Sequence, residues 1–187
     1  MRGEELAILL LDFEKAYDRV DWTFLEAAML RMGFPPVWIR GVSALYRTAH
    51  SQVLLAGDRG ERFALSRSVR QGCPLAPTLF LFFAEAMSSF WGSQGIGLTG
   101  LRLPVREEDL LDAEFADDTA VYLQGQDANL ARFQEALERF CDASGAKINW
   151  HKSFGFWVGS GPTPLGRQMR FFVGCPQARR FVIWAAR

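Results

Sequence analysis

The sequence has few cysteines, no excess of charge and no long apolar run, and each of these absences excludes a class of protein. Its three cysteines are odd in number and far apart, at Cys73, Cys141 and Cys175, so they fit neither a disulfide framework nor a zinc-binding pattern. No apolar run reaches the length of a membrane span, and acidic residues follow Gly3 at once, unlike a secretory signal. We therefore expect an intracellular protein in a reducing compartment, with no membrane partner.

Lysine and arginine together number 21, as do aspartate and glutamate, so the formal net charge is zero. A free-standing nucleic-acid-binding protein usually has a basic excess, and the total argues against one. The charges are unevenly placed, however, because residues 107–118 contain seven acids and no base, and residues 147–187 contain seven bases and no acid. An acidic pocket beside a basic segment suits a metal-dependent enzyme that acts on nucleic acid, although charge alone favours chance clustering on a solvated surface.

The hydrophobic pattern predicts one α+β domain with a sizeable core, since 49% of the 187 residues are hydrophobic. The expected strands are Leu6–Leu11, a hairpin from His50 to Val69 around Gly57–Gly60, a hairpin over Ala113–Leu123, and short strands at Ile148 and Phe154–Val158. For the first strand, periodicity alone leaves a helix open. Strands and helices mix without strict alternation, which is typical of an α+β layer sandwich.

Apolar residues at helical spacing predict four helices. The first begins after an Asp21 N-cap and stops near Gly33, and the second opens at Pro35. The second helix should bury one face, formed by Ile39, Val42, Leu45 and Tyr46. The third follows a Thr78 cap from Leu79 to about Trp91, is apolar almost all round and should lie in the core. The fourth follows an Asp127 cap, ends at Gly145 and buries Leu130, Phe133, Leu137, Phe140 and Cys141.

Three aspartates stand at the ends of apolar segments, where carboxylates are costly unless they are paired or bind a metal. Asp12 follows the first strand, and Asp117 and Asp118 form the tip of the second hairpin. Convergent carboxylates without a neighbouring base suit hard cations such as Mg²⁺, and two such ions can assist a phosphoryl transfer. Taken singly, each aspartate is more simply a turn residue or a helix cap, and spacing does not show whether Asp12 meets the hairpin.

Four ordered motifs resemble those of reverse transcriptases from LINE-type (non-LTR) retrotransposons and group II introns. They are Leu11–Asp21 (LDFEKAYDRVD), Arg70–Pro77 (RQGCPLAP), Phe115–Asp118 (FADD) and Gly145–Ser153 (GAKINWHKS), and Phe171–Gly174 (FFVG) more weakly resembles the fifth, primer-grip motif. The third motif alone is a weak signal, but four motifs in family order are a strong one. An unrelated metal-binding protein would have to match all four by coincidence. The resemblance implies a polymerase palm over residues 1–159, followed by a loop and weakly matching segment over residues 160–187.

The resemblance also implies roles for three aspartates and one lysine of the motifs. Asp12, Asp117 and Asp118 would be the catalytic, metal-binding carboxylates for Mg²⁺ or Mn²⁺, with the backbone carbonyl of Phe13 as a further ligand. Lys152 would lie near the triphosphate and help to protonate the departing pyrophosphate. Without the family, Lys152 is more simply a surface lysine.

Further matching residues would contact the substrates. Tyr17 would be the steric gate beneath the incoming sugar, because an aromatic face stacks on deoxyribose but leaves no room for a 2′-OH; a core tyrosine is the alternative. Gln71 and Gly72 would touch the nucleotide and the template strand, since glycine lets backbone approach a nucleic-acid chain closely; a turn before a helix is the alternative. Arg70 would lie near phosphates or simply be solvated.

The implied function is RNA-directed DNA polymerase: a primer 3′-OH attacks the α-phosphate of a dNTP, and pyrophosphate leaves. The implied partners are an RNA template, a DNA primer and dNTPs, and nuclear action is implied only by how such elements integrate. Ala146 stands where the family commonly has leucine. The family's fingers strands before the first motif and its thumb after the fifth are not recognised. We therefore expect incomplete fingers and no thumb, in either a part of a longer product or an inactive truncated remnant that at most binds nucleic acid.

Overall fold

The computed structural model describes residues 5–70, 72–104 and 108–158. Gln71, the fifth-motif residues Phe171–Gly174 and the expected loop and segment over residues 160–187 lie outside these ranges. No helix within the described ranges is long and apolar enough to cross a membrane.

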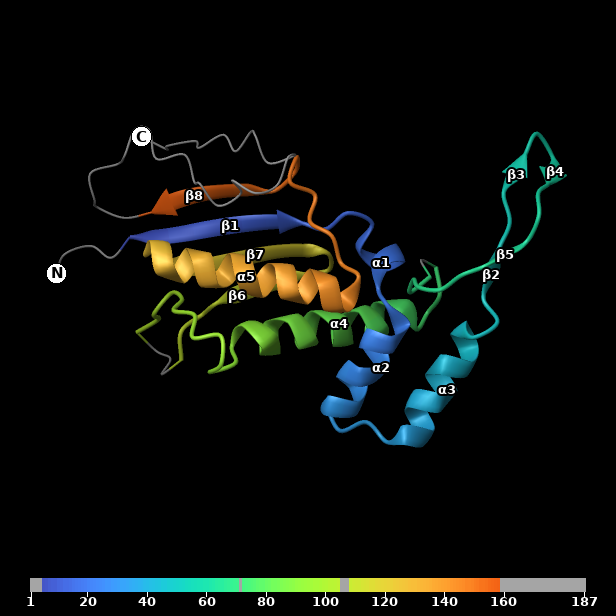
Figure 1. Ribbon diagram of the computed structural model, residues 1–187, viewed down its shortest axis with the longest axis horizontal. Helices are drawn as coiled ribbons and strands as arrows, with labels where there is room; N and C mark the ends of the chain where they lie inside the picture. Colours follow the sequence, from blue (N-terminus) through green and yellow to red (C-terminus); the bar gives the residue numbers. More distant parts are fainter. Residues whose placement is uncertain (1–4, 71, 105–107, 159–187) are drawn as a thin grey trace.

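A four-stranded antiparallel sheet forms one layer of the molecule (Figure 1). Its strand order is β6-β7-β1-β8, so β1, the first strand in sequence, lies inside the sheet between β7 and β8. The strands are β1 (Leu6–Asp12), β6 (Asp112–Phe115), β7 (Asp118–Gln124) and β8 (Phe154–Val158). The predicted first strand, second hairpin and final strand are therefore confirmed, while Ile148 forms only an isolated bridge with Phe13.

Helices α4 (Ala76–Trp91) and α5 (Asp127–Ser144) form the second layer, along one face of the sheet (Figure 1). Helices α1 (Ala16–Arg19), α2 (Trp22–Arg31) and α3 (Pro36–Tyr46) lie beyond the end of β1. The expected α+β class, an antiparallel sheet backed by helices, is confirmed. Burying each leucine or phenylalanine between the layers contributes about 1.5–3 kcal/mol.

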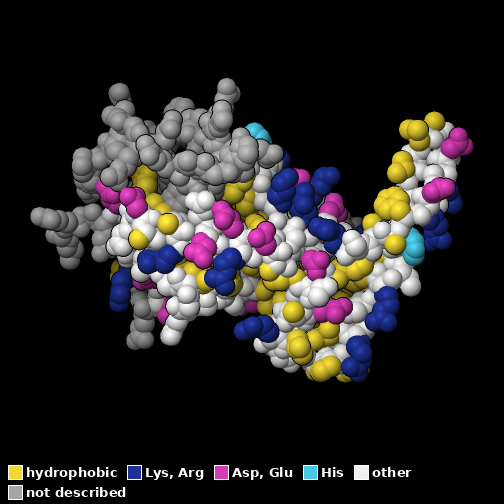
Figure 2. Space-filling view, in the orientation of Figure 1, with side chains coloured by type: hydrophobic (Ala, Val, Ile, Leu, Met, Phe, Trp, Pro, Cys, Tyr) yellow, Lys and Arg dark blue, Asp and Glu magenta, His cyan; other side chains and the backbone are white. Residues whose placement is uncertain are grey.

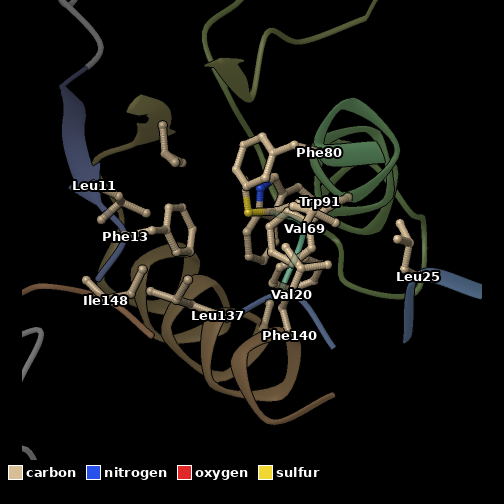
Figure 3. Close-up of a cluster of buried hydrophobic side chains, with 14 of the residues drawn as sticks. Leu11, Phe13, Val20, Leu25, Val69, Phe80, Trp91, Leu137, Phe140 and Ile148 are labelled. Atoms are coloured by element: carbon tan, nitrogen blue, oxygen red, sulfur yellow. The ribbon is translucent and has the colours of Figure 1, made fainter. Parts of the chain in front are cut away.

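The core lies where the end of β1 meets α4 and α5 (Figure 3). Leu11 and Phe13 point from β1 toward Leu137 and Phe140 of α5, and all four side chains are buried. Trp91, at the end of α4, is 1% exposed, with its ring centroid 5.7 Å from that of Phe140. Since alternate residues of a strand point to opposite faces, burial of Leu11 and Phe13 leaves Asp12 on the open face.

A narrow β-arm projects from the body after α3 (Figure 1). Its stem pairs β2 (His50–Ser51) with β5 (Phe63–Ala64), and its outer part pairs β3 (Leu54–Leu55) with β4 (Asp58–Arg59). The expected hairpin is therefore confirmed, but its turn falls at Ala56 and Gly57, both at positive φ, rather than over Gly57–Gly60. Apolar side chains stay exposed along the arm, with basic side chains beside them (Figure 2).

Two predicted helix starts are wrong, one by three residues and one by a single residue. Helix α4 begins at Ala76 and contains Thr78, because Pro77 suits the first turn of a helix, where its missing N–H is not needed. Helix α5 has Gln126 as its N-cap, and Asp127 stands inside its first turn, where a negative charge favours the helix dipole. By contrast, Asp21 caps α2 as predicted, since its Oδ1 accepts the backbone N–H groups of Thr23 and Phe24.

Two predictions of burial are also wrong. Leu45 is 66% exposed, because α3 buries the stripe of Ile39, Val42 and Tyr46, and Leu45 lies outside it. Leu81 is 63% exposed, so α4 buries one face rather than its whole circumference. The predicted stripe of α5 is buried apart from Cys141, which is half-buried. The helix ends at Gly145 as predicted.

Candidate active site

Asp12 and Asp118 occupy facing positions on neighbouring strands. In the antiparallel pairing of β1 with β7, Asp12 is the register partner of Asp118. Leu11, Phe13 and Thr119 are buried on the helix side, so strand alternation places both aspartates on the open face of the sheet. Facing residues have Cβ atoms about 4.5–5.5 Å apart, which brings the two carboxylates within reach of one cation.

Asp117 lies at the tip of the β6–β7 hairpin, in a two-residue turn with Ala116. The flanking residues Phe115 and Asp118 pair across the turn. Ala116 has φ 56°, and this left-handed conformation costs a residue other than glycine about 1–2 kcal/mol. The Asp117 side chain is exposed, so it stands beside the facing pair rather than in register with Asp12.

A cavity of about 480 Å³ opens over the facing pair. Asp12, Asp118 and Lys152 all line it, which places the predicted lysine and two predicted carboxylates around one space. Its apolar lining includes Phe115 and Phe154, which are 84% and 55% exposed. The structure therefore brings together three of the expected polar residues, with Glu114 and Thr119 as further polar residues in the lining.

The donor set in this cavity fits Mg²⁺ or Mn²⁺. Within residues 5–70, 72–104 and 108–158, no three histidine, cysteine, aspartate or glutamate side chains converge closely enough to hold a metal by themselves. Mg²⁺ is usually bound through one or two carboxylates together with substrate phosphates and water. Asp12 and Asp118 supply two hard oxygen donors of that kind, and Asp117 is next to them in the chain.

The main chain of Asp12 is held by the turn that precedes β8. The Asp12 N–H donates to Ser153 Oγ (3.0 Å), and the Asp12 carbonyl accepts the Asn149 N–H (2.8 Å). Ser153 is 4% exposed, and its hydroxyl donates in turn to the Asn149 carbonyl (2.9 Å). Asp12 is therefore fixed on both sides of its backbone by residues of the fourth motif.

Glu14 ties the same two segments together through its side chain. Its carboxylate contacts Arg19 Nη2 and Lys147 Nζ, each at 2.9 Å. Hydrogen bonds from Lys147 and then Arg19 hold the pKa of Glu14 at about 2. The Glu14 N–H also donates to the Lys147 carbonyl (2.8 Å), so the turn after Asp12 is anchored by both backbone and side chain.

Behind the aspartate hairpin, Asp112 and Glu114 of β6 are paired with the buried residues Val121 and Thr119 of β7. Ser88 Oγ of α4 donates to Asp112 Oδ1 (3.1 Å). Burial, and then the charge of Asp112, raise the pKa of Glu114 to about 8. Burial also raises the pKa of Asp112. Asp112 therefore supports the hairpin from behind, whereas Glu114 also lines the cavity over Asp12 and Asp118.

The residues predicted to contact the substrates are not among those that line the cavity over Asp12. Tyr17 is half-buried and stacks on Phe80, with ring centroids 4.4 Å apart and planes 12° apart. It does not line the cavity over Asp12. Gly72 is exposed with φ 84°, a conformation that suits glycine. Phe13 has a buried side chain, so only its backbone is available to a ligand.

Sequence reasoning missed the three residues that position the aspartates. Ser153 and Asn149 lie in the fourth motif and Glu14 lies in the first, but no local pattern assigns them a partner. Their partners are fixed by the pairing of β1 with β8, which brings the fourth motif to the end of β1. The only sequence feature that pointed to these three residues was their position inside the family motifs.

Comparison with known sequences identifies the family. The pattern of the family described as "Reverse transcriptase (RNA-dependent DNA polymerase)" matches residues 2–174. The chain is 36% identical over 159 residues to the "Transposon TX1 uncharacterized 149 kDa protein" of Xenopus laevis, covering 84% of this chain and 12% of that protein. It is 28% identical over 158 residues to the "RNA-directed DNA polymerase from mobile element jockey" of Drosophila melanogaster, covering 81% and 16%.

Solved structures support the fold. Apo telomerase of Candida tropicalis, truncated of its C-terminal domain, matches with a TM-score of 0.57 at 15% identity, covering 84% of this chain and 31% of that chain. Telomerase of Candida albicans in complex with a fragment of telomeric RNA matches with a TM-score of 0.56 at 15% identity, covering 84% and 27%.

The antiparallel sheet backed by helices, with its match to telomerase, defines the palm fold of a polymerase. The chain belongs to the reverse transcriptase family, and its relatives are proteins of non-LTR retrotransposons, as the four motifs predicted. It spans 12–16% of the length of these relatives.

Proposed function

We propose that this chain is the catalytic palm of an RNA-directed DNA polymerase that extends a DNA primer with dNTPs on an RNA template. The observation that carries the proposal is the facing register of Asp12 and Asp118 over a cavity that Lys152 also lines. Family membership supplies the reaction class, and the geometry supplies a place on this chain for its charged groups.

The chemistry depends on charge stabilisation at an in-line displacement. Two bound divalent cations would activate the primer 3′-OH and stabilise the leaving oxygen. Asp12 and Asp118, at facing strand ends, and Asp117, in the exposed turn, are the residues that would hold these cations. Lys152 places its ammonium group toward the departing pyrophosphate and donates a proton to it.

Rigid placement of Asp12 is the main contribution of the surrounding fold. A misplacement of about 1 Å can cost a factor of about 100 in rate. Ser153 and Asn149 hold the Asp12 backbone on both sides, and Glu14 locks the following turn to Lys147. These are positioning residues, because they act through Asp12 and do not touch the reacting atoms.

Tyr17 selects the sugar, and Gln71 and Gly72 position the template. Tyr17, whose ring is held by stacking on Phe80, is the steric gate that excludes a 2′-OH. Gln71 and Gly72 contact the nucleotide and the template strand. Because Gly72 has no side chain, the backbone there can approach the nucleic acid closely.

The test is primer extension on a poly(rA)/oligo(dT) duplex with Mg²⁺ or Mn²⁺. We expect incorporation by the chain, and its loss in Asp12→Asn and Asp118→Asn. Asp142→Asn, an exposed carboxylate on α5, is the matched control and should retain activity. Incorporation that persists in Asp118→Asn would contradict the assignment of the site. No incorporation by a chain that unfolds cooperatively would instead favour the inactive remnant.

A further inference from the structure

Strand β6 leads into the turn that holds Asp117, and it is a short edge strand of four residues. Within the described ranges it pairs with β7 alone, because the sheet order places it outermost (Figure 1). A strand with one neighbour has a ladder of hydrogen bonds on one side only. The position of the turn therefore depends on what else holds β6 to the body of the protein.

The side chains of β6 provide little apolar anchorage. Its second and fourth residues are exposed, and the fourth, Phe115, is 84% exposed. Asp112 and Glu114 alternate with these exposed residues. Their register partners on β7, Val121 and Thr119, are buried on the helix side. Facing residues of paired strands share one face of a sheet, so the β6 side chains that point toward the helices are both carboxyl groups.

The two carboxyl groups connect β6 to α4 through polar contacts. Ser88 Oγ of α4 donates to Asp112 Oδ1 at 3.1 Å, and the Glu114 carboxyl group is hydrogen-bonded to that of Asp112. An ionised carboxylate only accepts hydrogen bonds, so two carboxyl groups bond to each other only while one of them carries a proton. We call this set of three side chains, Ser88, Asp112 and Glu114, the carboxyl latch.

Glu114 is the group that carries the proton. Burial, and then the charge of Asp112, raise the pKa of Glu114 to about 8, and the charge of Glu85 on α4 adds to the shift. Strand β7 faces the pair with Thr119 and Val121, which carry no charge. Glu114 Oε1 is also buried without a hydrogen-bond partner among the described residues, and a charge on such an atom is costly. The surroundings therefore favour the neutral form of Glu114 at neutral pH.

We propose that Glu114 is a positioning residue for Asp117: its protonated carboxyl group bonds Asp112 and holds β6, together with the turn, against α4. When Glu114 gives its proton to hydroxide or buffer, two carboxylates stand side by side in a partly buried place. They repel each other and take up water, so β6 separates from the helix layer and the turn loses its fixed position. The latch itself does not depend on the proposed function, and only its effect on cation binding rests on that function.

Hydrogen exchange of backbone amides tests the carboxyl latch without any assay of polymerisation. The amides of β6 should exchange faster than those at the centre of β1 at every pH, because β6 opens without the rest of the sheet. The latched state holds one proton more than the open state. After correction for the intrinsic effect of pH on exchange, the protection of the β6 amides should therefore fall by up to about ten-fold per pH unit from about pH 6 to about pH 8 and then level off.

Three substitutions separate the carboxyl latch from a general effect of pH. Glu114→Gln keeps a donor for Asp112 at every pH, so the β6 amides should stay protected across the whole range. Glu114→Ala removes the bond, and its β6 amides should exchange at a fast rate that does not change with pH after the same correction. Glu108→Gln, which removes an exposed carboxyl group, is the matched control and should keep the pH dependence of the unsubstituted chain.

Two results would overturn the proposal. The first is exchange of the β6 amides at the same rate as those of β1, which would show that β6 opens only when the whole protein unfolds. The second is a pH dependence of β6 protection that persists in Glu114→Gln.

The affinity for Mg²⁺ distinguishes positioning from simple charge. If ionised Glu114 acted only as one more negative charge near the site, it would strengthen the binding of a cation by Coulomb attraction. Displacement of the turn predicts the opposite sign, because Asp117 no longer stands beside Asp12 and Asp118. Calorimetric titration with Mg²⁺ should therefore show weaker binding at about pH 9 than at about pH 7 in the unsubstituted chain, and equal binding at both in Glu114→Gln.

The outcomes of that titration are separable. Binding that becomes stronger at the higher pH in the unsubstituted chain alone would contradict the positioning role of Glu114. No binding by either protein would contradict the proposed metal site, and hydrogen exchange alone then decides whether the carboxyl latch exists.

Discussion

The hydroxyl of Ser153 accepts the backbone N–H of Asp12 at 3.0 Å, across 141 positions of sequence. This bond links the first and fourth family motifs at the strand end where Asp12 faces Asp118. The position of the Asp12 carboxylate therefore depends on the Ser153 hydroxyl, a neutral group that takes no part in the proposed reaction. The relationship can be tested apart from the carboxylates.

Ser153→Ala should lower both stability and catalysis. It leaves the Asp12 N–H without its partner, at a cost of about 1–3 kcal/mol in the free energy of unfolding, while the Asn149 carbonyl keeps the backbone N–H groups of Lys152 and Ser153. We expect kcat to fall more than the affinity for dNTP, because the position of Asp12 changes and the nucleotide contacts remain. Urea unfolding and steady-state primer extension measure the two effects.

The matched control for that prediction is Ser89→Ala, which removes an exposed hydroxyl on α4 that bonds Glu85. Its free energy of unfolding should change by less than about 0.5 kcal/mol. Equal effects of the two substitutions would show that Ser153 has no special part in holding Asp12.

Asp118→Asn should stabilise the metal-free protein while removing its response to Mg²⁺. Like charges that face each other across two strands are destabilising, and a cross-strand pair is worth about 0.2–1 kcal/mol, so the free energy of unfolding should rise by that amount at neutral pH. Mg²⁺ should stabilise the unsubstituted chain by mass action and leave the variant unchanged.

Thermal unfolding with and without Mg²⁺ makes this comparison. Asp58→Asn on the exposed arm serves as the control and should keep the full response to Mg²⁺. A loss of stability in metal-free Asp118→Asn would argue that the two carboxylates do not repel one another.

Glu114 should make stability fall as the pH rises. Its pKa is about 8 in the folded protein against 4.5 for the free side chain, so the folded state holds an extra proton between these values. The free energy of unfolding therefore decreases from about pH 4.5 to about pH 8 and then levels off, with a slope of at most about 1.4 kcal/mol per pH unit from this group.

Glu114→Gln should flatten that slope, because an amide carries no charge at any pH in the window. Urea unfolding over pH 5–9 measures the slope for the chain, for Glu114→Gln and for the exposed control Glu108→Gln. If the slope is unchanged in Glu114→Gln, another group causes the dependence of stability on pH, and the prediction for Glu114 is wrong.

Gly145→Ala should destabilise the protein through both conformation and crowding. Gly145 has φ 77°, and an added Cβ would lie 2.8 Å from the Arg19 carbonyl oxygen. Residues held in such conformations cost of order 1–3 kcal/mol, and crowding against backbone adds to that cost. Gly95→Ala is the matched control, since nothing lies within 4 Å of its added Cβ. Similar unfolding curves for the two variants would contradict the close packing of Gly145 on Arg19.

Short-range features of this protein were determined by its sequence. The first strand, the Asp21 cap, the buried stripe of α5 and the hairpin ending in Asp117 all follow from residues within a few positions of each other. The four motifs also identified the family, because each motif is contiguous in sequence. These features need only local propensity and the periods of 3.6 and 2.0.

Tertiary structure decided which of these local features meet. The pairing of Asp12 with Asp118 and the bond from Asp12 to Ser153 join segments far apart in sequence. Local rules also misjudged Leu45, because the side of a helix that is buried depends on its neighbours. Strand register and packing are settled by burial shared across the whole sheet and helix layer, and no short window of sequence contains that information.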